Sequence, residues 1–425
     1  MRRMPPSAPR LAAWALLAAL GCRKAPPPAL DLARAGVPAL RAACDRGDAP
    51  ACGALGERLE LGTGVARDPA EARRRYQRAC DRREWASCTR LGWLHEAGLG
   101  GGQDAARAAS LYRRACDAGH QRGCTNLGWM MENGASLPRD VPGAIERYQR
   151  ACTGDEPVAC ANLGRLVSDG AAVPGASLGA QGYFDKACRL GDAGSCTRLG
   201  WIFEEGRGAP RDLAHAASAY RLGCDRGDLR GCVNVAWLQQ NGSGVPRDLA
   251  AARALYERAC TGGNALGCAN LGVLYEQGIG VTADPARAAG HYERGCAEGN
   301  ARACAGLGSM LQEGRGVARD AARALTLDVR ACEGGNALAC NNAGWLLSES
   351  ASGLPLDPAR ARSLYGRGCE LANPTACNNL GSIYQHGRDV QPDRARAEAL
   401  YNAACNYGDQ NGCALARALH APAPT

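Results

Sequence analysis

Among the residues of this chain that could do chemistry, the cysteines have the most regular spacing. Of its 23 cysteines, 22 form eleven Cys-x₇-Cys pairs, and successive pairs begin 36 residues apart except for one step of 37. Cysteines paired at such strict spacings favour structural disulfides formed in an oxidising compartment. Zinc sites usually take two ligands separated by only about two to four residues. We therefore expect no metal and no other cofactor, and a disulfide within each of the pairs Cys44 and Cys52, Cys80 and Cys88, Cys116 and Cys124, Cys152 and Cys160, Cys188 and Cys196, Cys224 and Cys232, Cys260 and Cys268, Cys296 and Cys304, Cys332 and Cys340, Cys369 and Cys377, and Cys405 and Cys413.

Candidate catalytic groups other than cysteine are sparse. Residues 175–179 read Gly-Ala-Ser-Leu-Gly, which matches a nucleophile elbow in its letters, but that elbow functions only on a strand-to-helix turn. A serine β-lactamase needs a serine three residues before a lysine, and the two lysines, Lys24 and Lys186, have Gly21 and Tyr183 at that position. Redox-active pairs are normally Cys-x-x-Cys, and the six histidines are scattered singly. We expect no catalytic residue and no enzyme activity.

The charge pattern disfavours nucleic acid as a partner. The formal net charge is +8, and the 42 acidic residues are interleaved with the basic ones along the chain. A nucleic-acid interface would instead concentrate basic residues in a patch or stripe. We expect no nucleic-acid partner.

The N-terminal segment predicts export. Three arginines precede a run of ten apolar residues, 11–20, which is too short to span a bilayer and is typical of a secretion signal. Ala19-Leu20-Gly21-Cys22 resembles a bacterial lipobox, so residues 1–21 are predicted as a lipoprotein signal peptide and Cys22 as the lipidated residue. An ordinary secretion signal with a chance cysteine is the alternative.

Residues 22–35, rich in proline, are predicted as a tether. The expected location is the periplasm, with a lipid anchor in the membrane. Because Arg23 rather than aspartate follows the cysteine, the outer membrane is favoured over the inner one.

Each 36-residue period contains the signals of two helices. In residues 260–296 the apolar spacing predicts a first helix, A, from near Leu266 to Gln277, ended by Gly278. Asp284 and Pro285 are typical of the start of a second helix, B, which runs to the next cysteine. Aspartate recurs at the same position as residues 68, 104, 140, 212, 248, 284, 320, 357 and 393, and only the fourth unit departs, with Ala176. Each cysteine pair thus links helix B of one repeat to helix A of the next.

Helix B also carries a recurrent tyrosine, four residues before its cysteine. We expect these tyrosines to pack between helices with their hydroxyls at a rim; they are residues 76, 112, 148, 220, 256, 292, 365 and 401. A disulfide that closes so short a loop stabilises the fold by about 2–3 kcal/mol. Such a period indicates a solenoid. The predicted fold is an all-α, right-handed α-solenoid superhelix of about ten repeats over residues 36–418. Residues 29–44 are expected to form a lone helix B, 412–420 a lone helix A, and 419–425 a short tail.

Three recurrent motifs resemble those of the Sel-1-like repeat family, which is related to the tetratricopeptide repeat. They are Cys-x-Asn-Leu-Gly at residues 268–272, Gly-x-Gly-Val at 278–281 and Tyr-x-x-Ala-Cys at 256–260. The resemblance covers essentially all of residues 36–418 and implies a scaffold that assembles partners along an inner curve. The cysteine pairing is similar to that of a secreted, cysteine-rich bacterial branch, some members of which have been described as β-lactamase-like or penicillin-binding. A β-lactam-binding or β-lactam-hydrolysing protein is therefore the alternative function.

Two positions of helix A do not fit the core pattern. Asparagine stands two residues after the second cysteine at positions 126, 162, 234, 270, 342 and 379 (Asn126, Asn162, Asn234, Asn270, Asn342, Asn379), and tryptophan stands five after it at positions 93, 129, 201, 237 and 345 (Trp93, Trp129, Trp201, Trp237, Trp345). The two positions share one helix face. We hypothesise a groove that binds a protein or peptide partner of the cell envelope, with peptidoglycan or another envelope polymer as a further possible ligand. The alternative is that the asparagines pair with nearby backbone while the tryptophans pack between repeats.

Overall fold

The computed structural model describes residues 31–174 and 178–419, and every regular element in these residues is a helix. The chain divides into two compact units, residues 1–114 and 115–425. The first unit contains α1 (Val37–Asp45), α2 (Ala49–Leu61), α3 (Pro69–Cys80), α4 (Trp85–Glu96) and most of α5 (Ala105–Asp117). The signal peptide, Cys22, the serine at position 177 and Ala176 lie outside the described residues. Residues 31–35, the described part of the expected tether, form a turn, and Arg58 on α2 donates to the carbonyl of Ala33 at 3.0 Å.

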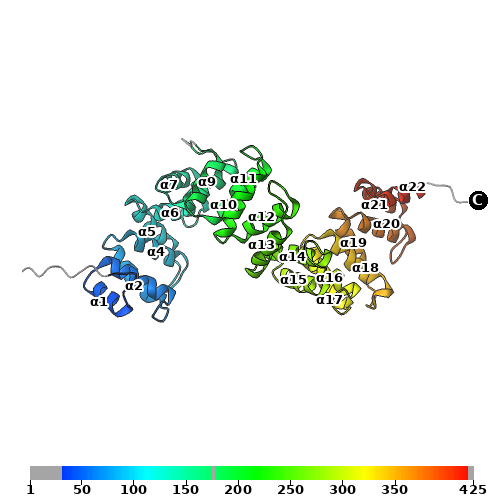
Figure 1. Cartoon of the computed structure of the whole chain (residues 1–425), viewed down its shortest axis with the longest axis horizontal. Helices are drawn as coiled ribbons and strands as arrows, with labels where there is room; N and C mark the ends of the chain where they lie inside the picture. The colour runs from blue at the N-terminus through cyan, green and yellow to red at the C-terminus, as the bar shows by residue number, and fades with distance from the viewer. Residues whose placement is uncertain (1–30, 175–177, 420–425) are drawn as a thin grey trace, which may run out of the picture. The chain divides into compact units, whose positions relative to one another are not determined.

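The second unit continues the same alternation of helices (Figure 1). Its helices are α6 (Gln121–Asn133), α7 (Val141–Thr153), α8 (Pro157–Ser168), α9 (Ala180–Arg189), α10 (Ala193–Glu205), α11 (Leu213–Asp225), α12 (Leu229–Asn241), α13 (Leu249–Thr261), α14 (Ala265–Gln277), α15 (Pro285–Ala297), α16 (Ala301–Glu313), α17 (Ala321–Glu333), α18 (Ala337–Ser348), the short 3₁₀ helix η1 (Ser350–Ser352), α19 (Pro358–Glu370), α20 (Pro374–His386), α21 (Arg394–Asn406) and α22 (Gln410–Ala418). From α2 onward the even-numbered helices are the predicted A helices and the odd-numbered ones the B helices. The lone helices expected at the two ends are present as α1 and α22. The predicted start of the first one, at residue 29, is wrong in the described residues, because residues 32–34 form a turn and α1 begins at Val37.

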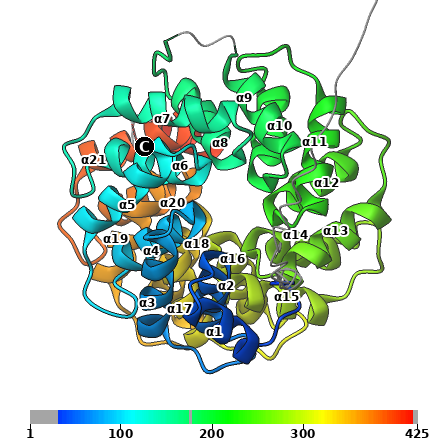
Figure 2. The ribbon, with the colours of Figure 1, turned by 90° about the vertical axis from the view of Figure 1, so that its left-hand side faces the viewer.

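Within the second unit the A helices lie on the inner side of the stack. Figure 2 shows α10, α12 and α14 inside and α11, α13 and α15 outside. The inner face of this unit is therefore formed by A helices, as expected of a solenoid whose units contact mainly their sequence neighbours.

The predicted helix boundaries are confirmed by their capping contacts. All nine aspartates accept a backbone N–H at the start of helix B, as Asp284 does from Arg287 at 3.0 Å. Gly278 ends helix A with φ of 67°, a conformation that side chains rarely adopt. The A helices have caps of their own that the sequence reasoning missed: Asn264, for example, accepts from Gly267 N at 3.0 Å.

The recurrent tyrosines form the centre of the repeats that carry them, as predicted. Tyr292 is 2% exposed, and its ring lies directly on Gly272 of helix A. A Cβ atom at residue 272 would lie 2.5 Å from Cε1 of this ring, so only glycine leaves room for it. The same contact joins Gly200 to Tyr220. A glycine four residues after the second cysteine is thus a seat for the tyrosine ring.

Every described disulfide bridges its own seven-residue gap. The structure joins all eleven predicted pairs, each at the corner between helix B and the following helix A. Together with the helix pairs, this confirms the predicted disulfide-stapled α-solenoid. A cation from the next repeat also binds many of these corners: Lys186 donates to the carbonyl of Cys152 at 2.7 Å, and Arg258 to that of Cys224 at 2.8 Å. Each staple is thereby connected to its neighbour.

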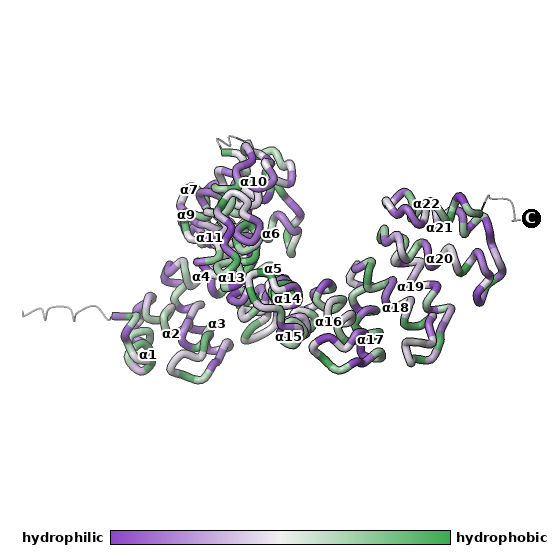
Figure 3. Tube along the Cα trace, turned by 45° about the vertical axis from the view of Figure 1, so that its right-hand side comes forward, coloured by the Kyte–Doolittle hydropathy of each residue, from purple (hydrophilic) through white to green (hydrophobic). Residues whose placement is uncertain are grey.

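Figure 3 shows hydrophobic and hydrophilic residues alternating along the individual helices, as expected when each helix buries one face. In the described residues no helix has the length and apolar character needed to cross a membrane.

Candidate functional site

The predicted tryptophans lie at the surface of the A helices. Trp129 on α6, Trp201 on α10, Trp237 on α12 and Trp345 on α18 are 45%, 39%, 47% and 39% exposed, and Trp93 on α4 in the first unit is 37% exposed. Burial of a tryptophan ring stabilises a fold substantially. These rings are partly covered and partly open to solvent, so the binding groove and the packing between repeats both stay predictions.

The predicted asparagines are half-buried, and two of them contact tyrosines, a role that neither interpretation of the sequence foresaw. Asn234 on α12 hydrogen-bonds the hydroxyl of Tyr220 on α11, and this hydroxyl donates to Glu204 on α10 at 2.5 Å. Asn162 contacts Tyr148 in the same way. Because an asparagine carries two donor hydrogens and an acceptor oxygen, one bond to a tyrosine leaves further hydrogen-bonding capacity at the surface.

The tyrosine hydroxyls stay protonated at neutral pH in this arrangement. Burial, followed by the hydrogen bond to the Glu204 carboxylate, raises the pKa of Tyr220 well above its ordinary value. The chain Glu204–Tyr220–Asn234 therefore connects three successive helices by fixed donors and acceptors, and it orients Asn234 on the inner face.

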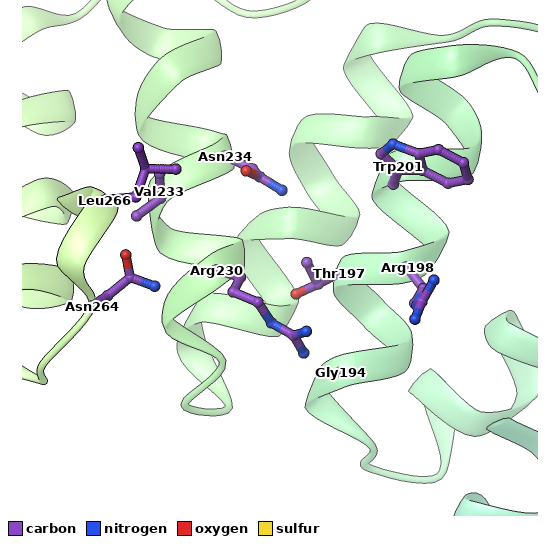
Figure 4. Close-up of a pocket in the computed structure, with 9 residues that line it drawn as sticks. All are labelled: Gly194, Thr197, Arg198, Trp201, Arg230, Val233, Asn234, Asn264 and Leu266. Atoms are coloured by element: carbon purple, nitrogen blue, oxygen red, sulfur yellow. The ribbon is translucent and has the colours of Figure 1, made fainter. Parts of the chain in front are cut away.

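One cavity brings predicted residues from neighbouring repeats together. It has a volume of about 310 Å³ and lies over α10, α12 and the start of α14. Figure 4 shows the lining side chains on these three helices. They are Gly194, Thr197, Arg198, Trp201, Arg230, Val233, Asn234, Asn264 and Leu266.

Two arginines give this cavity its charge. Arg230 is paired with Asp228, with 3.1 Å between Nε and Oδ1. Burial alone would raise the pKa of Asp228, but hydrogen bonds from Arg230 and Thr197 bring it below its ordinary value, so the carboxylate stays ionised. Arg198 is exposed, and within the described residues no hydrogen bond or ion pair holds its guanidinium. The sequence reasoning missed Arg198, although its position in the asparagine register was visible.

The remaining predicted binding residues are distributed along the chain. Trp129 lies on α6, Asn270 on α14, Asn342 and Trp345 on α18, and Asn379 on α20, where it donates to Asn341 at 3.0 Å. They occupy equivalent places on successive A helices and do not converge on one point. Such an arrangement suits contact with an elongated ligand.

Among the described groups considered for catalysis, Lys186 is engaged in structural contacts. Lys186 binds the Cys152 carbonyl and forms an ion pair with Asp155 at 3.0 Å. In the part of the chain that the structure describes, no three metal-binding side chains gather at one place.

Comparison with known proteins identifies the repeat. The family model for the Sel1 repeat matches ten consecutive segments, residues 49–83, 85–120, 121–155, 157–192, 193–228, 229–264, 265–300, 301–336, 337–373 and 374–409. The chain belongs to the Sel1 repeat family. Each matched segment comprises one A helix and the B helix that follows it, so the resemblance predicted from the sequence motifs is confirmed. A Sel1 repeat scaffold is suited to protein–protein interaction.

Solved Sel1 repeat proteins share the fold. The crystal structure of c5321, a protective antigen present in uropathogenic Escherichia coli strains and displaying an SLR fold, is 24% identical with a TM-score of 0.60, over 91% of this chain and 90% of that one. A Sel1 repeat protein from Oxalobacter formigenes is 23% identical with a TM-score of 0.58, over 73% of this chain and 89% of that one. No curated protein sequence matches the chain.

Proposed function

We propose that this Sel1 repeat protein is a non-catalytic scaffold that binds protein or peptide partners along the inner face of its A helices. The main support for this proposal is that Trp201 and Trp237, at equivalent positions of two successive A helices, are 39% and 47% exposed. Tryptophan is strongly enriched among residues that dominate binding energy, because it buries a large, rigid surface. Half-buried Asn234, beside both of them on the same face, supplies hydrogen bonds that a polypeptide backbone needs.

Replacing Trp237 by alanine is expected to weaken binding of such a partner at least about tenfold. Partners would be captured by crosslinking in intact cells, identified by mass spectrometry, purified, and titrated onto the immobilised protein by interferometry. Leu222→Ala is the matched control. Leu222 is 37% exposed, and it lies on the B helix α11, outside the proposed face. Equal affinity of wild type and Trp237→Ala would exclude the inner face as the binding surface.

We also propose that the protein is exported and held in the periplasm by a lipid on Cys22, with the outer membrane as the favoured location. The signal-like residues 1–21 and the paired use of all cysteines other than Cys22 support this address. Cys22→Ser should abolish incorporation of radiolabelled palmitate and move the protein from the membrane to the soluble periplasmic fraction. Retention of the label in Cys22→Ser would refute lipidation at this residue.

A further inference from the structure

The row of asparagines on the inner face is interrupted by a charge. At the position two residues after the second cysteine, α8, α10 and α12 carry Asn162, Arg198 and Asn234. The two asparagines hydrogen-bond tyrosine hydroxyls. Arg198 is exposed, and no ion pair or hydrogen bond among the described residues satisfies its five donors. The row therefore presents a guanidinium available to an external acceptor between two neutral amides.

The cavity around Arg198 has apolar walls and one uncompensated charge. Trp201 lies one turn along α10, 39% exposed, and Leu266 at the start of α14 is 44% exposed. Arg230 on the opposite side is neutralised by Asp228. The cavity thus offers one positive charge beside apolar surface, which matches a single negative charge rather than a dianion.

We propose that this cavity binds a carboxylate carried by an extended peptide segment of the partner. The idea rests on the proposed function and assigns the chemistry of one of its contacts. A guanidinium binds a carboxylate through two parallel hydrogen bonds, a geometry specific to arginine. Asn234 then contacts the peptide backbone, and separate apolar side chains of the segment cover Trp201 on α10 and Leu266 on α14 (Figure 4).

The spacing of the repeats supports an extended conformation for this segment. Packed helices lie about 8–10 Å apart, and an extended chain advances about 3.1–3.3 Å per residue. Three peptide residues therefore span about one repeat, so equivalent side chains of the segment meet equivalent positions of successive A helices. The acidic residue at Arg198 then sets the register of the whole segment.

The test begins with selection of random dodecamer peptides displayed on phage against the oxidised full chain. A selected peptide is then synthesised with each acidic residue changed to its amide and with a free or amidated C-terminus. These two arms distinguish a side-chain carboxylate from a terminal one. Dissociation constants are measured by fluorescence anisotropy for wild type, Arg198→Gln and, as a control, Arg113→Gln, since Arg113 is exposed on the B helix α5.

Removal of one particular carboxylate is expected to weaken binding to wild type and to Arg113→Gln about tenfold, and binding to Arg198→Gln by less than about twofold. Selected peptides without an acidic group, or an equal loss in wild type and Arg198→Gln, would overturn the proposal. If Trp237→Ala loses affinity while Arg198→Gln does not, the carboxylate contact fails and the binding face stands. Selection of no peptide, or binding to insoluble peptidoglycan alone, would overturn both.

Discussion

Replacing Asp328 by tyrosine is expected to raise the free energy of unfolding of the α16–α17 repeat by several kcal/mol at pH 8. Asp328 occupies the tyrosine position of this repeat and is fully buried. It faces the seat glycine Gly308, and its carboxyl accepts one hydrogen bond, from Nε2 of Gln312 at 2.8 Å, while Oδ1 has no hydrogen-bond partner. Tyrosine at this position would fill the seat and bond Gln312, as Tyr256 bonds Gln240 at 3.1 Å.

The same residue gives the repeat a pH dependence of known sign. Burial, opposed only by the hydrogen bond from Gln312, raises the pKa of Asp328 from 3.8 to about 8. In the unfolded chain the carboxyl loses its proton near pH 4, whereas in the folded chain it keeps the proton until about pH 8. Between these values the folded state binds the extra proton, so stability is highest below pH 4 and falls as the pH rises to about 8. A shift of this size corresponds to on the order of 5 kcal/mol.

Hydrogen exchange measured by mass spectrometry at pH 5 and pH 8, corrected for the intrinsic rate, would follow α16 and α17 directly. Wild type should lose protection in these helices at the higher pH, while Asp328→Asn should show little difference. Tyr256→Asp, which creates the same pairing with Gln240, is the matched control and should transfer the pH dependence to α12 and α13. If Asp328→Asn lost protection with rising pH as much as wild type does, another group would be responsible for the pH dependence.

Reduction of the disulfides is expected to have the largest effect on the whole chain. Each disulfide joins cysteines eight residues apart, and on the chain-entropy model it adds about 2–3 kcal/mol to the free energy of unfolding. Eleven such contributions exceed the ordinary net stability of a domain, about 5–15 kcal/mol. Apart from tyrosine and leucine, the buried core consists largely of alanine and cysteine, so hydrophobic burial per repeat is modest. The reduced protein should lose most of its helical signal at 37 °C.

Circular dichroism of oxidised and reduced protein during heating provides the measurement. Changing Cys224 and Cys232 together to alanine should lower stability by about 2–3 kcal/mol, with the loss concentrated at the α11–α12 corner. Cys22→Ser is the control, because it removes a cysteine that belongs to no Cys-x₇-Cys pair. Identical melting of oxidised and reduced protein would mean that packing alone holds the repeats.

Features that depend on residues close in the sequence were predicted well. The helix boundaries follow from Asp284, Pro285 and Gly278, whose capping and turn preferences act within a few residues. The cysteine pairs close loops so short that their bonding follows from spacing alone. The exposed tryptophan face followed from helical periodicity, although periodicity could not decide whether Trp201 packs against the next repeat or stays open.

Contacts between repeats were beyond such reasoning. The role of Asn234 depends on Tyr220 of the preceding helix. The environment of Arg198 depends on residues of α12 and α14. Asp328 was visible as a gap in the tyrosine register, but only the packing of α17 against Gly308 shows that its carboxyl is buried with a single donor. The sequence by itself thus determined the repeat, its staples and the order of its helices, because those depend on local conformational preference. Tertiary structure alone decided which side chains meet across neighbouring repeats, because burial and charge pairing depend on the distance in space between groups that lie far apart in the sequence.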